Sequence, residues 1–256
     1  MLNISTQDAV RTLVFDRPEA KNTLVPELAE GLISAFDDAA GDPAVKVLVL
    51  AGSGGVFSAG IDLSCLMNRE KPENKRMIHE RLPAMVEAFI RFPKPLILAI
   101  NGIGVGFGAT LCGLGDVTIM EEDARLRAPF TALGVVPELA STYMFPALMG
   151  RQKATWMLMA AEWIDAQAAY QAGLVMEVVG TGEALAAAQT RAATLAALPL
   201  DSLVRTKRLL MAPHLDAMLT ANREEFSNFW ETTDGPAAAE AVNAFLEKRA
   251  PDFSNH

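Results

Sequence analysis

Apolar runs of strand length alternate with segments of helical spacing over about the first 180 residues of the chain. Val45–Ala51 (VKVLVLA) and Leu96–Ile100 (LILAI) are almost wholly apolar, which is typical of strands covered on both faces of a sheet. Between such runs, apolar side chains recur three and four positions apart, as in Pro26–Ala40. Only helical patterns follow residue 180. The order of elements therefore predicts an α/β core with a helical C-terminal part.

The same patterns give the bounds of the expected elements. Strands are expected at 10–16, 45–51, 96–100, 117–120 and 174–179. Helices are expected at 26–40, 82–92, 141–149, 153–161, 165–172, 184–198, 200–211, 224–230 and 236–248. A charged, proline-interrupted tract at 68–76 is expected to lie outside the core. We divide the chain into a core at 1–195 and a helical oligomerisation region at 196–256.

Composition narrows the classes of partner. The 256 residues fit one large domain, and a net charge of −9 counts against nucleic acid as the main partner. We expect no membrane partner, because no apolar stretch is long enough to span a bilayer. The two cysteines, Cys65 and Cys112, are too few for a disulfide framework, so a cytoplasmic location is the simplest expectation. The positive mean hydropathy indicates that some surface is buried between subunits.

The sequence is most unusual between Pro93 and Asp116 (PKPLILAINGIGVGFGATLCGLGD), where an apolar strand runs into densely spaced glycines. Glycines of this density are typical of close backbone approach. If a helix begins near Gly106, its free N–H groups form a site for an anion or an oxyanion. Two other interpretations stay open from this stretch alone: tight packing without a ligand, and a dinucleotide site, because Gly104–Ala109 matches GxGxxA.

A second glycine turn lies in Val56–Leu63 (VFSAGIDL), after the strand at 45–51. On its own it could be an ordinary turn. Together with the first stretch it offers a second backbone N–H, and two N–H donors from separate segments are what an oxyanion hole requires.

Several motifs, in order along nearly the whole chain, resemble the enoyl-CoA hydratase/isomerase (crotonase) superfamily. They are RPEAKNTL at 17–24, FSAGID at 57–62, the glycine stretch, APF followed by GVVPE, GRQKA at 150–154 and AYQAGLVMEVV at 169–179. The resemblance implies a spiral of ββα units with a helical C-terminal trimerisation region, and an acyl-CoA thioester ligand. It also implies a homotrimer or a hexamer made of two trimers, and no metal or redox cofactor, because coenzyme A is part of the substrate.

Carried over position by position, the resemblance implies that the N–H groups of Ile61 and Phe107 form the oxyanion hole. The neighbouring turn residues Ala59, Gly60 and Gly106 would contact the substrate, with the Ala59 carbonyl oxygen at the adenine. The backbone around Ala20 and Lys21 would flank the nucleotide. Leu66, Met67 and Met85 are expected along the acyl chain.

The reaction depends on carboxylates. Hydratases of the family use two glutamates, and Thr110 and Phe130 stand at those positions here, where neither side chain can exchange a proton. Glu138, eight residues after Phe130, resembles the single base of the Δ3,Δ2-enoyl-CoA isomerase branch, although from the residues alone it would be a surface acid. We therefore expect an isomerase that converts 3-enoyl-CoA to trans-2-enoyl-CoA. A hydratase, another acyl-CoA reaction on this fold, and a non-catalytic acyl-CoA-binding subunit are the alternatives.

Overall fold

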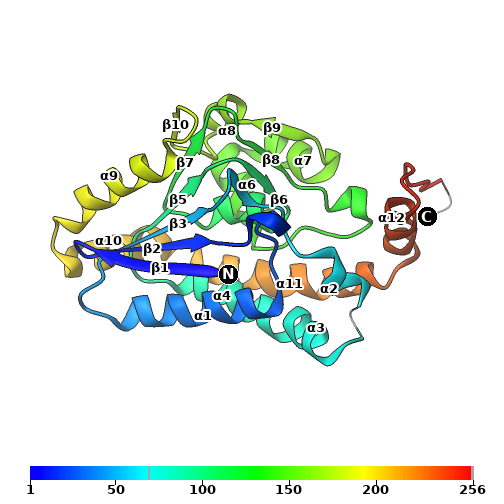
Figure 1. The fold of residues 1–256 in the computed structure, drawn as a ribbon, viewed down its shortest axis with the longest axis horizontal. Helices are drawn as coiled ribbons and strands as arrows, with labels where there is room; N and C mark the ends of the chain where they lie inside the picture. Colours follow the sequence, from blue (N-terminus) through cyan, green and yellow to red (C-terminus); the bar gives the residue numbers. More distant parts are fainter. Residues whose placement is uncertain (69, 255–256) are drawn as a thin grey trace.

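The computed structural model describes residues 1–68 and 70–254; Arg69, in the expected polar tract, and residues 255–256 lie outside the described residues. A six-stranded sheet forms its centre, in the order β1-β2-β3-β5-β7-β10 (Figure 1). The strands after β1 run parallel to one another, and β1 pairs antiparallel with β2. Their bounds are β1 Leu2–Gln7, β2 Val10–Phe15, β3 Val47–Gly52, β5 Leu96–Ile100, β7 Val117–Glu121 and β10 Glu177–Val179.

A second sheet of four short strands lies beside the first, in the order β4-β6-β8-β9. These strands span Val56–Ser58, Ile103–Val105, Arg125–Arg127 and Trp163–Asp165. Each of the consecutive pairs β3–β4, β5–β6 and β7–β8 gives its first strand to the large sheet and its second strand to the small one. This repetition is the spiral that the family resemblance implies. It brings the ends of β4 and β6 side by side.

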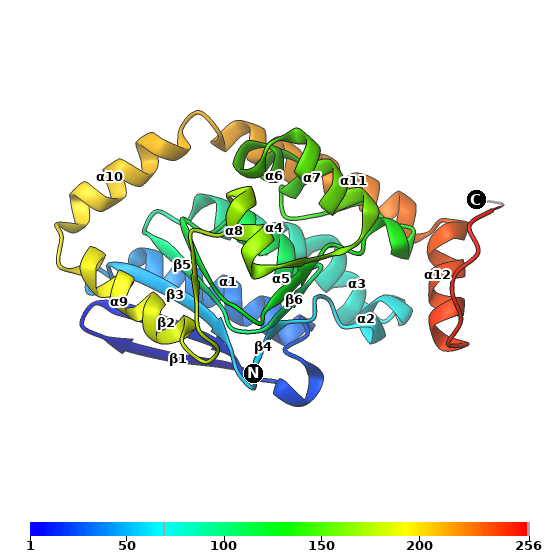
Figure 2. The same ribbon diagram turned by 90° about the horizontal axis from the view of Figure 1, so that it is seen from above.

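Helices cover both faces of the large sheet and extend the molecule at both ends (Figures 1 and 2). The N-terminal helices are α1 Pro26–Gly41, α2 Leu63–Met67, α3 Pro72–Arg76, α4 Leu82–Arg91 and α5 Phe107–Thr110. The later ones are α6 Ser141–Met149, α7 Arg151–Ala160, α8 Ala166–Ala172, α9 Ala184–Ala196, α10 Leu200–Met211, α11 Leu215–Thr233 and α12 Pro236–Leu246. A π-helical segment, Met77–Arg81, joins α3 to α4, and three-residue 3₁₀ turns occupy 18–20, 111–113 and 131–133. Over the described residues, no helix is both long and apolar enough to cross a membrane.

The central strand β3 is buried along its whole length, as its apolar run predicts. Leu48 and Leu50 face the main core with α1 and α4, whereas Val47 and Val49 face α9. α9 meets that second face with alanines one turn apart, and their small side chains let the helix lie close to the sheet. Both faces of the sheet are therefore covered by helices. We expect the functional site at the ends of the strands.

Two expectations about helices are wrong in detail. The helix expected at 224–230 is part of the much longer α11, and the tightly packed helix expected after Gly106 is one α-helical turn followed by a 3₁₀ turn. As expected, no described residue of the tract at 68–76 belongs to the hydrophobic core; Asn74 is buried and donates a hydrogen bond to the Asn68 carbonyl oxygen within the tract. The remaining expected helices are present, with bounds that differ by a few residues.

Candidate active site

Two glycine turns, one after β4 and one after β6, contact each other at the end of the small sheet. Gly60 has a φ of +89° and Gly106 a φ of +54°, conformations that side chains disfavour. A Cβ atom on Gly60 would lie 2.8 Å from the Val105 carbonyl oxygen, and one on Gly106 would lie 4.0 Å from the Gly60 Cα. The residues that follow these glycines, Ile61 and Phe107, are therefore brought together from separate turns.

The N–H of Ile61 is left free by the way its strand pairs. Leu24 forms an isolated parallel bridge with Ile61, in which its N–H donates to Gly60 and its carbonyl accepts from Asp62. Because a parallel bridge uses the two flanking residues, the N–H of Ile61 points to the other side. Among the hydrogen bonds of the described residues, none is donated by this N–H.

The N–H of Phe107 is free because Phe107 is the first residue of α5, whose opening N–H groups have no partner in the helix. No hydrogen bond within the described part of the chain uses it. The Phe107 side chain is buried, and its ring centroid lies 6.2 Å from that of Phe15. Since α5 is a single turn, the N–H itself, rather than a long helix dipole, is available to an oxyanion. So short a helix also removes the dinucleotide interpretation of this stretch.

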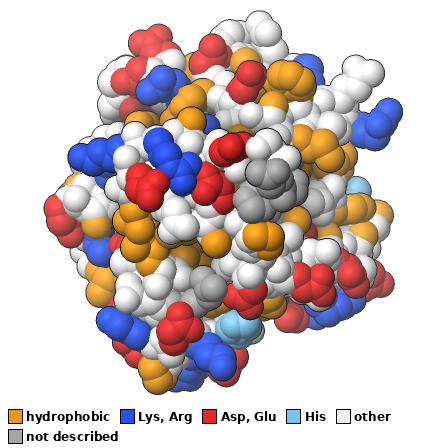
Figure 3. All heavy atoms as spheres, turned by 90° about the vertical axis from the view of Figure 1, so that its right-hand side faces the viewer, with side chains coloured by type: hydrophobic (Ala, Val, Ile, Leu, Met, Phe, Trp, Pro, Cys, Tyr) orange, Lys and Arg blue, Asp and Glu red, His pale blue; other side chains and the backbone are white. Residues whose placement is uncertain are grey.

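Both turns open into a cavity of about 540 Å³ with mainly apolar walls. Of the residues expected at the site, this cavity is lined by Ala59, Gly60, Ile61, Gly106, Phe107, Phe130 and Glu138. Leu66 and Met67 from α2 also line it, but Met85 does not, because its side chain is buried in the core under α4. The far wall comes from the end of α11 and from α12 of the same chain. Figure 3 shows that end of the molecule, where hydrophobic side chains lie in separate groups among charged ones.

Glu138 is the buried carboxylate of this cavity, and its partner is the hydroxyl of Thr110. Both side chains are almost fully buried, and Thr110 Oγ1 lies 2.7 Å from Glu138 Oε1. The same hydroxyl lies 3.0 Å from the Gly106 carbonyl oxygen. When Glu138 is ionised, Thr110 can donate to it; when Glu138 is protonated, Thr110 can accept from it and donate to Gly106. Thr110 therefore matches both protonation states of Glu138, a role that the sequence does not reveal.

The pKa of Glu138 is raised to about 8, chiefly by burial; the Thr110 hydrogen bond lowers this pKa and the charge of Glu225 raises it. Oε2 of Glu138 accepts no hydrogen bond from the described residues, so it is free for a proton from a ligand. The buried Phe130 ring lines the same cavity. A carboxylate with a pKa near neutrality in an apolar cavity is suited to taking up and returning a proton.

Ala20 and Lys21 lie beside the site rather than in the cavity wall. They belong to the turn after β2, and the Lys21 carbonyl oxygen accepts a hydrogen bond of 2.9 Å from the Ala59 N–H. Lys21 is exposed and has a φ of +53°. The two segments expected to flank a nucleotide are therefore adjacent.

Two aspartates outside the cavity have structural partners. Asp62 accepts a hydrogen bond from Ser64 N and begins α2, and Asp116 accepts from Leu96 N and from Lys207 Nζ. His214 is half-buried, and its Nδ1 lies 2.9 Å from the Tyr143 hydroxyl.

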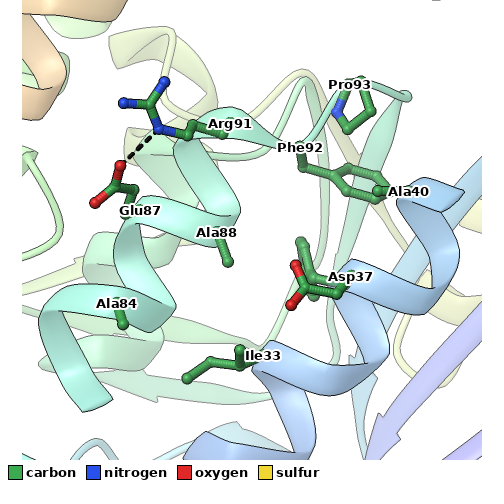
Figure 4. A pocket seen from close by; sticks show the side chains of 10 residues that line it. Ile33, Asp37, Ala40, Ala84, Glu87, Ala88, Arg91, Phe92 and Pro93 are labelled. Carbon is green, nitrogen blue, oxygen red and sulfur yellow. Dashed lines mark hydrogen bonds and ion pairs between the residues drawn. The ribbon is translucent and has the colours of Figure 1, made fainter. Parts of the chain in front are cut away.

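A separate shallow groove of about 320 Å³ lies between α1 and α4 (Figure 4). Ile33, Ala84 and Ala88 form its apolar part, and Arg91 at its rim is paired with Glu87 at 2.6 Å. None of the expected site residues lies in this groove. The cavity that holds Glu138 is therefore the candidate active site.

Comparison with known proteins agrees with this geometry. A family model described as enoyl-CoA hydratase/isomerase matches residues 5–256. Enoyl-CoA delta isomerase 2 from Rattus norvegicus is 31% identical over 250 residues, 96% of this chain but only 63% of the rat protein. The 2,3-dehydroadipyl-CoA hydratase from Escherichia coli K12 is 33% identical over 255 residues, 98% of both chains.

Solved structures of similar fold belong to the same class of protein, the enoyl-CoA hydratases/isomerases. An enoyl-CoA hydratase/isomerase from Pseudoalteromonas atlantica T6c matches with a TM-score of 0.91 and 31% identity over 99% of both chains. The fold is therefore crotonase-like, as the motifs predict. The chain belongs to the enoyl-CoA hydratase/isomerase family, and is an enzyme of this family, which acts on acyl-CoA thioesters.

Proposed function

We propose that the protein is an acyl-CoA isomerase that moves the double bond of 3-enoyl-CoA to give trans-2-enoyl-CoA. The observation that carries the proposal is Glu138, the one buried carboxylate among the described residues that line the cavity, with Thr110 and Phe130 at the positions where hydratases of the family have glutamates. Hydration needs a carboxylate that activates water and an acid that protonates C2. A mainly apolar cavity in which the buried carboxylate is Glu138 supports proton transfer without water.

In this mechanism the thioester oxygen accepts hydrogen bonds from the N–H groups of Ile61 and Phe107. Glu138 removes a proton from C2, and the electron pair of that C–H bond forms a dienolate whose negative charge lies on the thioester oxygen. The protonated Glu138 then gives the proton to C4, so that C3=C4 is replaced by C2=C3. The reaction is a proton shift without change of oxidation state, which is why we propose no metal or redox cofactor.

The coenzyme A part of the substrate would lie along the turns that carry Ala59 and Ala20–Lys21, with the acyl chain toward Leu66 and Met67. We also propose a homotrimer or a pair of trimers. The support is the set of large apolar side chains that one chain leaves exposed on α7 and α10, among them Trp156, Met159, Leu209 and Leu210. A cytoplasmic location remains part of the proposal.

The test uses 3-hexenoyl-CoA, with the wild-type protein, Glu138→Gln and the control Glu122→Gln, which removes an exposed carboxylate of the turn after β7. We expect the wild type and the control to form conjugated product. Glu138→Gln should bind the substrate but lose about 10²–10⁴-fold in kcat, the usual contribution of a general base. A Glu138→Gln rate within about tenfold of the wild type would contradict the proposed role of this residue.

The alternative with specific support is hydration, because a relative named as a hydratase is as similar to the chain as the named isomerases. A hydratase would consume crotonyl-CoA rapidly, and an isomerase with one carboxylate would not.

A further inference from the structure

A second buried carboxylate, Glu225 on α11, lies close to Glu138 without entering the cavity wall. Glu225 is 5% exposed and takes part in no ion pair among the described residues. Its three hydrogen-bond donors belong to the start of α6, more than eighty residues earlier in the chain. Burying a carboxylate costs free energy, so a buried glutamate beside the turn that follows Glu138 is expected to have a structural or functional role.

The hydrogen bonds hold the turn that follows Glu138. Glu225 Oε2 accepts from Ala140 N at 2.6 Å, and Oε1 accepts from Thr142 N at 2.8 Å and from Thr142 Oγ1 at 2.6 Å. The donors are peptide N–H groups and a hydroxyl, so the site requires an acceptor at both oxygens. A carboxylate meets that requirement, and an amide does so at one position only.

The turn itself is strained. Leu139 and Ala140 have φ values of 62° and 52°, so two consecutive residues with side chains adopt the left-handed conformation. Each such residue costs on the order of 1 kcal/mol or more and persists where other contacts hold it. Because the strained pair directly follows Glu138, the contacts that hold it also determine where the Glu138 carboxylate points.

The charge of Glu225 acts on the same group. It is the ionisable residue whose charge raises the pKa of Glu138, and the pKa of Glu225 is itself raised to about 7, chiefly by burial. Other titratable side chains on elements packed against α11 are engaged elsewhere: Tyr143 with His214, His79 against Trp230, and Glu87 with Arg91. None of them contributes to the pKa of either glutamate.

We propose that Glu225 is a positioning residue, whose carboxylate holds the left-handed Leu139–Ala140 turn and thereby sets the direction of the Glu138 carboxylate. The role of Glu138 as base rests on the proposed function, whereas the link between the two carboxylates does not. α11 thus connects the helical C-terminal part to the reacting group.

The test compares Glu225→Gln with Glu224→Gln, a control that removes the neighbouring, exposed carboxylate of the same helix. With 3-hexenoyl-CoA, Glu225→Gln should lower kcat by about 10–100-fold with little change in KM, because misplacing a catalytic group affects the chemical step. Its pH profile should rise at lower pH than in the wild type, because a negative charge beside Glu138 has been removed. Glu224→Gln should match the wild type in both respects.

The titration of Glu138 can be read without turnover, by carbon-13 NMR of glutamate-labelled protein, with the signal identified by its absence in Glu138→Gln. A lower midpoint in Glu225→Gln supports the proposal even if wild-type protein proves inactive on 3-hexenoyl-CoA, which would overturn only the proposed reaction. If Glu225→Gln does not fold, Thr142→Val removes one of the three donors and should shift kcat and the midpoint in the same directions by a smaller amount. An unchanged midpoint and kcat in the folded variant would overturn the proposal.

Discussion

Replacing Thr110 by valine tests the hydrogen bond between Thr110 and Glu138. The change exchanges a hydroxyl for a methyl group of similar size, so packing in the one-turn helix α5 is preserved. It removes the 2.7 Å bond to Glu138 Oε1, and that bond lowers the pKa of Glu138. We therefore expect the pKa of Glu138 to rise further above about 8 in the Thr110→Val variant.

The size of the effect follows from the charge of the acceptor. A buried hydrogen bond to an ionised group contributes roughly 1.5–3 kcal/mol, which corresponds to a rise of about one to two pKa units. Because the base must be ionised to accept the C2 proton, kcat/KM at pH 7 should fall about 10–100-fold. The loss should be recovered as the pH is raised above the new pKa.

The assay is the initial rate of 3-hexenoyl-CoA isomerisation between pH 6 and pH 10, for the wild type, Thr110→Val and Thr110→Ser. The serine variant keeps the hydroxyl and should follow the wild-type profile. A loss in Thr110→Val that is equal at every pH would refute this reasoning, because it would assign Thr110 a packing role without influence on the proton affinity of Glu138.

Two further predictions concern stability and backbone geometry. Because the folded-state pKa of Glu138 is raised, the folded protein binds more protons than the unfolded chain between about pH 4.5 and pH 8, and this group makes the protein less stable as pH rises through that range. The free energy of unfolding of Glu138→Gln, relative to that of the wild type, should therefore rise by about 1.4 kcal/mol per pH unit in that range. Calorimetry at several pH values measures this difference, and a difference independent of pH would contradict the prediction. Gly60→Ala should abolish most activity, because the new Cβ meets the Val105 carbonyl oxygen and displaces the Ile61 N–H, whereas Gly55→Ala, also at positive φ but with open space around it, should lose only stability. Equal kinetic effects of the two alanine variants would argue against an oxyanion role for Ile61.

Much of the fold could be predicted because burial on both faces leaves a simple pattern. The apolar runs at β3 and β5 and the alanine-rich α9 are examples. The three-residue strands of the small sheet are too short to show any period, and each forms only because its neighbour pairs with it. The N-terminal half of α11 was missed for a different reason. Its buried face follows helical spacing, but the polar Asn222 interrupts the apolar pattern there.

The sequence also does not reveal Glu225 as a partner of the site, although Glu225 lies in the part of α11 that was predicted. Seen in the sequence, it is one acid among several in a polar helix, and only the fold brings it to Ala140 and Thr142. The contact between Thr110 and Glu138 is similar, because the two residues are separated by 28 positions and meet through the ββ spiral. The motif resemblance points to Glu138 and to position 110. The protonation chemistry required the three-dimensional arrangement.

The most direct test of the central claim is the conversion of two substrates by the wild-type protein, followed by ultraviolet absorbance of the conjugated enoyl thioester. With 3-hexenoyl-CoA the absorbance should grow, and with crotonyl-CoA it should change little, because one buried carboxylate in a mainly apolar cavity shifts a proton but does not add water. Rapid loss of the crotonyl-CoA absorbance would contradict the account and identify a hydratase that works without glutamates at positions 110 and 130.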